Sequence, residues 1–265
     1  MFAFPNVPPG EYVIQAYRGR VNDHAEGEFG AVFVSVDDAD VTGVVVRTLS
    51  GSSVTGRFRF DVHAAATTPK LSDFELAAIP TDFDMSPNNP ASAKIHGDWT
   101  FEVSGLNGPR RLQLVRTPPG FALEEMRVNG TDVTDRPIAL GTRAQSLANV
   151  EVVVTDRVTE LRGAIVDDRA RPVGGATVIV FSMDRQQWYP ASRYLRRSSS
   201  SQNGAFTMTG LPAGSYFVSA LAAIPTGAED AWTDPEFLES LIPGASTISF
   251  TDRQKAVLTL RLRSP

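Results

Sequence analysis

The sequence contains no cysteine and only three histidines in 265 residues. The lack of cysteine excludes disulfides, thiolate zinc sites and a cysteine nucleophile. No segment approaches the ~20 consecutive apolar residues of a membrane-spanning helix, and residues 1–5 lack the basic and apolar regions of a signal peptide. The net charge of -5 leaves no basic surface for phosphate groups, so nucleic acid is not an expected partner.

The patterns that carry catalysis or metal binding are also missing. His24, His63 and His96 lack the spacing that would place two ligands on one zinc ion. No Gly-x-Ser-x-Gly motif or phosphate-binding loop occurs. Asp132 and Asp135 form a short acidic cluster, but the spacing and terminal Glu of an EF-hand are absent, which favours turn-forming roles. We therefore expect a protein that is not an enzyme and that binds no cofactor and no metal.

What the sequence does contain is the composition of an all-β protein. Its 21 Gly and 18 Pro are spread along the chain, and they divide it into many short elements. Ser198–Ser201 is interpreted as a polar loop. Strands are expected over residues 11–17, 31–36, 42–48, 53–61, 74–79, 99–104, 110–116, 121–128, 149–155, 159–167, 176–182, 204–209, 215–221, 246–250 and 256–262.

One short helix is expected, over residues 234–241. Thr233 or Asp234 is suited to cap its N-terminus, and Pro235 fits the first helical turn. Phe237, Leu238 and Leu241 would form its apolar stripe.

One β-hairpin segment occurs three times. The clearest copy spans residues 203–218 (NGAFTMTGLPAGSYFV), and related copies span residues 98–114 (DWTFEVSGLNGPRRLQL) and 2–14 (FAFPNVPPGEYVI). In each copy an aromatic strand leads into a Pro-Gly or Asn-Gly-Pro turn, and apolar alternation resumes after it. The first two copies are about 105 residues apart, close to the ~100 residues of a β-sandwich domain.

These repeats divide the chain into three modules. A complete module is expected over residues 157–265, a second over 49–156, and the C-terminal part of a truncated module over 1–48. The alternative is that the strands of residues 1–48 complete the sheet of the second module.

The module of residues 157–265 resembles the carboxypeptidase regulatory-like domain. The resemblance rests on a Gly-containing first strand, a Pro-Val-x-Gly-Ala segment, an Asn-Gly-x-Phe strand and a Leu-Pro-x-Gly-x-Tyr turn, at residues 161–167, 172–176, 203–206 and 211–216. The second module lacks the Pro-Val-x-Gly-Ala segment. The resemblance implies immunoglobulin-like or prealbumin-like β-sandwich modules of a larger bacterial protein that is exported to the periplasm, the outer membrane or the medium.

Two functions are compatible with this fold. The first is a non-catalytic structural or protein-interaction role, in which the partner is another protein. The second is that of a carbohydrate-binding module of starch-binding-like fold, in which exposed aromatic rings stack on a polysaccharide. Trp188 and Tyr189, with Arg193 nearby, are the candidate ligand-binding residues, while Trp99 and Trp232 are assigned to core edges. Arg193, Arg196 and Arg197 could also form a small anion-binding patch.

Overall fold

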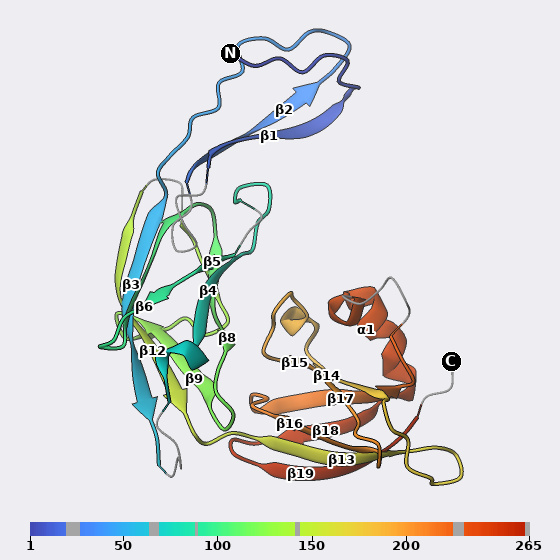
Figure 1. Cartoon of the computed structure of the whole chain (residues 1–265). Coiled ribbons are helices and arrows are strands. Elements are labelled where there is room, and N and C mark those ends of the chain that lie inside the picture. The colour runs from blue at the N-terminus through green and yellow to red at the C-terminus, as the bar shows by residue number, and fades with distance from the viewer. Residues whose placement is uncertain (20–26, 64–68, 88–89, 141–143, 225–230, 263–265) are drawn as a thin grey trace. The chain divides into compact units, whose positions relative to one another are not determined.

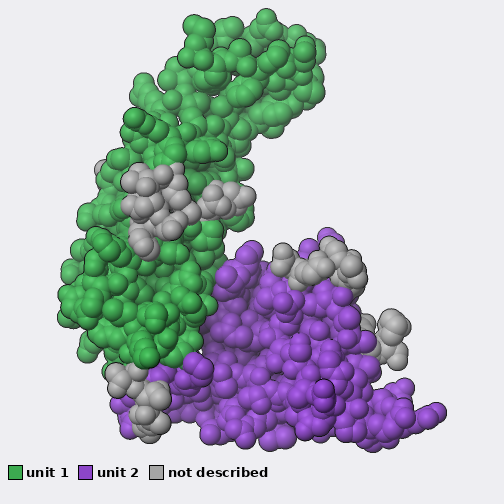
Figure 2. Space-filling model, in the orientation of Figure 1, with its two compact units in different colours: residues 1–60, 68–118, 123–154 green, residues 61–67, 119–122, 155–265 purple. Residues whose placement is uncertain are grey.

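The computed structural model describes residues 1–19, 27–63, 69–87, 90–140, 144–224 and 231–262. These residues form an all-β protein with one short α-helix (Figure 1). The chain divides into two compact units (Figure 2). Unit 1 comprises residues 1–60, 68–118 and 123–154, and unit 2 comprises residues 61–67, 119–122 and 155–265.

Short strands account for most of the regular structure. The strands of the first half of the chain are β1 (Gly10–Arg18), β2 (Glu28–Val36), β3 (Ser52–Asp61), β4 (Glu75–Pro80), β5 (Ala91–Ser92), β6 (Lys94–Ile95), β7 (Thr100–Leu106), β8 (Arg110–Arg116), β9 (Ala122–Val128), β10 (Thr131–Asp132), β11 (Pro137–Ile138) and β12 (Ser146–Thr155). Those of the second half are β13 (Glu160–Val166), β14 (Thr177–Ser182), β15 (Leu195–Ser199), β16 (Ala205–Thr209), β17 (Gly214–Leu221), β18 (Ser246–Phe250) and β19 (Lys255–Arg261).

The helical elements are few and short. They are the α-helix α1 (Pro235–Leu241) and the 3-10 helices η1 (Leu71–Asp73), η2 (Arg185–Gln187), η3 (Ala231–Thr233) and η4 (Ile242–Gly244). The expected helix is confirmed, with Asp234 as its cap: the Asp234 carboxylate accepts hydrogen bonds from the backbone N–H groups of Glu236 and Phe237. Leu238 and Leu241 are its buried residues.

Unit 2 is a sandwich of two sheets. One sheet has the strand order β16-β13-β19 and the other β15-β14-β17-β18. Alternate residues of both sheets point inward, so that Leu161 and Phe206 of the first pack in one core with Val180 and Tyr216 of the second. The opposite face of the second sheet is covered by α1, whose Leu238 and Leu241 pack in a separate cluster.

Unit 1 contains a second pair of sheets, with orders β10-β9-β12-β3-β7-β6 and β11-β8-β4-β5. The pairing of its opening strand matches that in unit 2: Gly56 lies opposite Phe101, as Gly163 lies opposite Phe206. A Cβ at Gly56 would overlap the Phe101 ring and the carbonyl oxygen of Val150 on β12. A Cβ at Gly163 would overlap the Phe206 ring and the carbonyl oxygen of Leu258 on β19.

The β1–β2 hairpin forms a sheet of its own within unit 1. Its strands pair antiparallel from Gly10 with Val36 to Arg18 with Glu28, and no third strand in the described part of the chain joins them (Figure 1). The alternative interpretation was that these strands complete the sheet of the second module. They do not, because they pair only with each other among the described strands.

Two expectations about individual strands are wrong. Residues 42–48 form no strand, apart from an isolated bridge between Phe29 and Leu49 just after them. Ser198 and Ser199 belong to β15 rather than to a loop, because β15 pairs with the buried strand β14, with Ser199 opposite Thr177. The polar alternation of β15 reflects its position at the edge of the sheet.

Candidate functional site

The structure places the Trp188 ring inside unit 2. The side chain is 7% exposed and belongs to the cluster between the sheet and α1. Its indole N–H donates to the carbonyl oxygen of Ser182 over 2.7 Å, and its ring meets Phe181 edge to face. A sugar ring stacks on an open aromatic face, which the buried Trp188 ring does not offer in this structure; ligand binding by Trp188 stays a prediction.

An ion pair closes the outer side of Trp188. The guanidinium of Arg185 lies 5.9 Å from the centre of the Trp188 ring, and the same group pairs with the carboxylate of Glu239 on α1. This pair raises the pKa of Arg185 and lowers that of Glu239, mainly through the side-chain hydrogen bond between them. The contact links η2 to α1, which indicates a structural role for Arg185 and Glu239.

The three arginines proposed as an anion patch do not form one surface. Arg196 lies opposite Val180 and Arg197 opposite Ile179, and neighbouring residues of a strand point to opposite faces. Arg197 stacks on Trp232 at 5.3 Å and Arg193 on Tyr194 at 5.4 Å.

Arg196 is half-buried. Burial, and then the nearby positive charge of Arg193, lower the pKa of Arg196. Tyr189, the other candidate residue, is half-buried. Ligand binding by Tyr189 and Arg193 stays a prediction.

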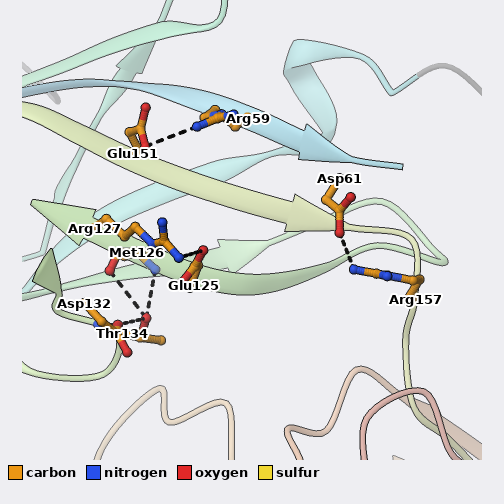
Figure 3. A network of polar contacts seen from close by, with 9 residues as sticks. All are labelled: Arg59, Asp61, Glu125, Met126, Arg127, Asp132, Thr134, Glu151 and Arg157. Carbon is orange, nitrogen blue, oxygen red and sulfur yellow. Dashed lines mark hydrogen bonds and ion pairs between the residues drawn. The ribbon is translucent and has the colours of Figure 1, made fainter. Parts of the chain in front are cut away.

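The remaining polar candidates have structural contacts. Asp132 accepts hydrogen bonds from the backbone N–H and hydroxyl of Thr134, at 2.8 and 2.5 Å, which lower its pKa (Figure 3). This is the turn-forming role preferred from the sequence. His63 lies 3.7 Å from Asp61, which also pairs with Arg157. His24 lies outside the described residues, and among those described no three His, Cys, Asp or Glu side chains form a metal site.

Figure 3 shows the other polar pairs around the strands of unit 1. Glu151 faces Arg59, and Glu125 contacts Arg127 at 2.8 Å. Such pairs at the protein surface contribute little to stability and indicate a solvated surface.

The β1–β2 hairpin carries the most unusual combination of features. The Tyr12 hydroxyl donates to the carbonyl oxygen of Pro8 over 2.8 Å, and the Tyr216 hydroxyl donates to that of Pro212 over the same distance. This arrangement, in which a tyrosine bonds back to the turn four residues before it, is known as a tyrosine corner. The hairpin therefore has the local geometry of β17 and β18.

The surroundings of the two tyrosines differ. Tyr216 is 0% exposed in a complete sandwich, whereas Tyr12 is only half-buried. On the outer side of the hairpin, Tyr17 is 77% and Phe33 62% exposed. An isolated two-stranded hairpin is at best marginally stable in water, so these apolar surfaces mark it as a candidate docking site.

Sequence reasoning did not single out Arg110. This residue is 0% exposed on β8, and its guanidinium donates to the carbonyl oxygen of Asn107 at 3.0 and 3.1 Å. It lies opposite Pro80 at the end of β4, as Tyr216 lies opposite Ser182 at the end of β14. The signal in the sequence was the turn Leu106-Asn107-Gly108-Pro109-Arg110, which ends on an arginine where the other copies have a tyrosine.

The described residues include no helix that is long and apolar enough to cross a membrane. No model of a known protein family matches the chain, and no curated protein matches it. Several solved structures align with it. One is the Bacillus anthracis TIE protein, at 13% identity and a TM-score of 0.27, over 97% of this chain but 42% of that protein. The chain thus spans less than half of that relative.

Two pilins are also similar. A streptococcal ancillary pilin aligns at 15% identity and a TM-score of 0.29, over 98% of this chain and 77% of the pilin. The minor pilin of Streptococcus agalactiae aligns at 10% identity and a TM-score of 0.31, over 82% of this chain and 97% of the pilin. At these TM-scores the alignments carry no argument about function, and they show no family to which the chain belongs.

Proposed function

We propose that the chain is a non-catalytic structural or protein-interaction protein of tandem β-sandwich modules, and that its β1–β2 hairpin binds a protein partner. The hairpin carries the proposal. It is a separate two-stranded sheet, and its outer side exposes Tyr17 and Phe33. A large aromatic side chain gains up to ~3 kcal/mol when it is buried against a partner.

The tandem arrangement is supported by two local correspondences. The opening glycine faces the hairpin phenylalanine in both sandwiches, as Gly56 with Phe101 and Gly163 with Phe206. The corner of Tyr12 matches that of Tyr216. We further propose that these modules are of the carboxypeptidase regulatory-like type and belong to an exported protein; this part rests on the sequence resemblance alone.

The carbohydrate-binding alternative receives no support from the geometry. Trp188, which would have been its stacking platform, packs against Phe181 and donates its indole N–H to Ser182. Trp232, the other tryptophan of unit 2, packs against the same core cluster and is covered by Arg197.

Site-specific photo-cross-linking tests the proposal. Benzoylphenylalanine replaces Phe33 in one version of the protein and Val257 in a control, since both are exposed apolar residues of strands and Val257 belongs to β19 of unit 2 rather than to the hairpin. Irradiation in cells that produce the protein naturally should give a discrete polypeptide adduct from position 33 and none from position 257. Equal adducts from both positions, or none from position 33, would contradict the proposal.

A further inference from the structure

We infer that the partner covers the outer side of the β1–β2 hairpin with an amphipathic helix, and that arginine or lysine flanks the apolar stripe of this helix. The outer side is the face of the hairpin that carries Val13, Gln15, Tyr17 and Phe33. The inference rests on the proposed function, and it specifies the structure and the charge of the partner segment.

The corresponding face of unit 2 is covered by a helix. The two corner tyrosines align β1 with β17, so that Val13 corresponds to Phe217 and Tyr17 to Leu221. Phe217 and Leu221 pack in one cluster with the buried side chains of α1. An apolar sheet face is stable when another element covers it, and in unit 2 that element is α1.

The hairpin has no room for such a helix in its own connection. In unit 2 the helix belongs to the connection between β17 and β18, where η3, α1 and η4 extend over residues 231–244. The equivalent connection between β1 and β2 consists of residues 19–27 only, which is shorter than those three elements together. Tyr17 is accordingly 77% and Phe33 62% exposed. The exposure of this face thus follows from a short connection inside the hairpin.

The exposed apolar surface continues from the hairpin onto a loop of unit 1 that follows β4. The side-chain amide of Gln15 donates to the backbone carbonyl oxygens of Phe83 and Asp84, over 2.7 and 3.1 Å. Phe83 is 53% and Met85 38% exposed. Contiguous apolar surface of this kind, beyond single exposed side chains, marks an interaction site.

The charged side chains around this surface are all negative. Glu11 lies on the outer face of β1 and Asp84 in the adjoining loop, and both are exposed. No lysine or arginine occurs in residues 10–17, 29–36 or 81–87. Carboxylates favour a partner of opposite charge, and the aromatic rings between them also attract cations. The flanks of the partner helix are therefore basic.

Unit 2 provides the comparison for this assignment of charge. There Glu239 of α1 pairs with Arg185 of η2, so the covering helix carries the negative charge and the sandwich the positive one. On the hairpin the surface itself is negative, which reverses the two signs. Glu11 and Asp84 would repel an acidic helix such as α1 and attract a basic one.

The described part of a second copy of this chain offers no helix of the required charge. Among the described residues the only α-helix is α1, and its sequence PEFLESL contains glutamate but no lysine or arginine. Its Leu238 and Leu241 are already buried in unit 2. The inferred occupant is therefore a basic partner helix rather than α1 of a second copy.

Three fluorescein-labelled peptides test the inference on the 265-residue protein. Each is based on residues 231–245 (AWTDPEFLESLIPGA). The first carries Glu236→Arg and Glu239→Arg, and the second is unchanged. The third adds Leu238→Ser and Leu241→Ser to the substitutions of the first. Fluorescence anisotropy should show saturable binding of the first peptide and about tenfold weaker binding of the other two.

Variants of the protein locate the site. Glu11→Gln combined with Asp84→Asn removes two charges and no apolar side chain, and it should abolish most of the preference for the first peptide over the second. Tyr17→Ser removes an exposed ring and should weaken binding of the first peptide by about tenfold. Val257→Ser removes an exposed apolar side chain of unit 2 and should leave the affinity within about twofold.

Equal binding of the first and second peptides overturns the inference. Absence of binding overturns it too, as does a preference that Glu11→Gln with Asp84→Asn leaves unchanged. If any of these results accompanies cross-linking from position 33, the proposed function stands and only the helix and its charge are refuted. Light scattering that shows a dimer of the unmodified protein and a monomer of Tyr17→Ser would identify a second copy as the occupant and also overturn the inference.

Discussion

Gly163 offers a sharp test of how the sandwich of unit 2 is packed. A Cβ at this position would lie 2.2 Å from the carbonyl oxygen of Leu258 and 2.5 Å from the ring of Phe206. Ordinary contact begins at 3.4 Å, so the Leu258 carbonyl would have to retreat by 1.2 Å. That carbonyl belongs to β19, which pairs in parallel with β13, and its retreat would weaken the pairing of the two strands.

We expect Gly163→Ala to destabilise unit 2 by about 2 to 4 kcal/mol. Overpacking of a core costs about 1 to 3 kcal/mol, and each weakened hydrogen bond adds about 0.5 to 1.5 kcal/mol. The corresponding fall in melting temperature is about 10 °C or more for a domain of this size.

Differential scanning calorimetry measures the change, and hydrogen exchange identifies which transition belongs to unit 2. Gly97→Ala is the matched control, because nothing lies within 4 Å of a Cβ at that position. It should change stability by less than about 0.5 kcal/mol. A Gly163→Ala protein as stable as the Gly97→Ala protein would refute the packing argument.

Three further predictions concern buried and charged groups. Tyr216→Phe should destabilise the protein by about 0.5 to 1.5 kcal/mol because it removes a part-buried hydrogen bond to the Pro212 carbonyl, whereas Tyr12→Phe, at a more exposed site, should cost less in urea denaturation. Asp132 has a pKa below its usual 3.8 in the folded protein, so its contribution is present above pH 3.8 and is lost as the pH falls through the lower folded-state pKa; Asp132→Asn should flatten the stability profile in that acidic range and lower stability by a constant amount at higher pH. Titration with soluble polysaccharides should leave the fluorescence of Trp188 unchanged, since the ring is buried, and a saturable change that Trp188→Ala abolishes would contradict this.

The fold class was predictable because it depends on local patterns. Alternation in residues 204–209 and 215–221 predicted strands that the structure contains as β16 and β17. The α1 helix was predictable for the same reason, since Asp234 and Pro235 act through their own backbone neighbours. Short-range signals of this kind need no knowledge of tertiary contacts.

The errors arose where tertiary context decides. Residues 42–48 have the sequence of a strand, but a strand needs a pairing partner, and in the described part of the chain only the isolated bridge between Phe29 and Leu49 forms next to them. β15 has a polar sequence and is nevertheless a strand, because it pairs with the buried β14. Trp188 could not be assigned to the core or the surface from its loop sequence, since its burial depends on Phe181 and on α1, more than forty residues away.

The turn that precedes β8 and the turn that precedes β17 each have a carbonyl oxygen that accepts a hydrogen bond from a side chain. The two sandwiches supply this donor with different residues. In unit 2 the Tyr216 hydroxyl reaches back to Pro212, and in unit 1 the Arg110 guanidinium reaches back to Asn107. A buried charge is tolerated only where hydrogen bonds compensate for its lost hydration, and Arg110 donates from two nitrogens to this one oxygen.

The hairpin uses the tyrosine rather than the arginine. A tyrosine hydroxyl can be served by water when it is exposed, so its bond back to the turn contributes most after the ring is buried. Tyr12 has this bond already formed and its ring half-covered. Tyr12 therefore has the corner geometry of Tyr216 without its full burial, so the bond of Tyr12 to Pro8 should contribute less to stability than the bond of Tyr216 to Pro212.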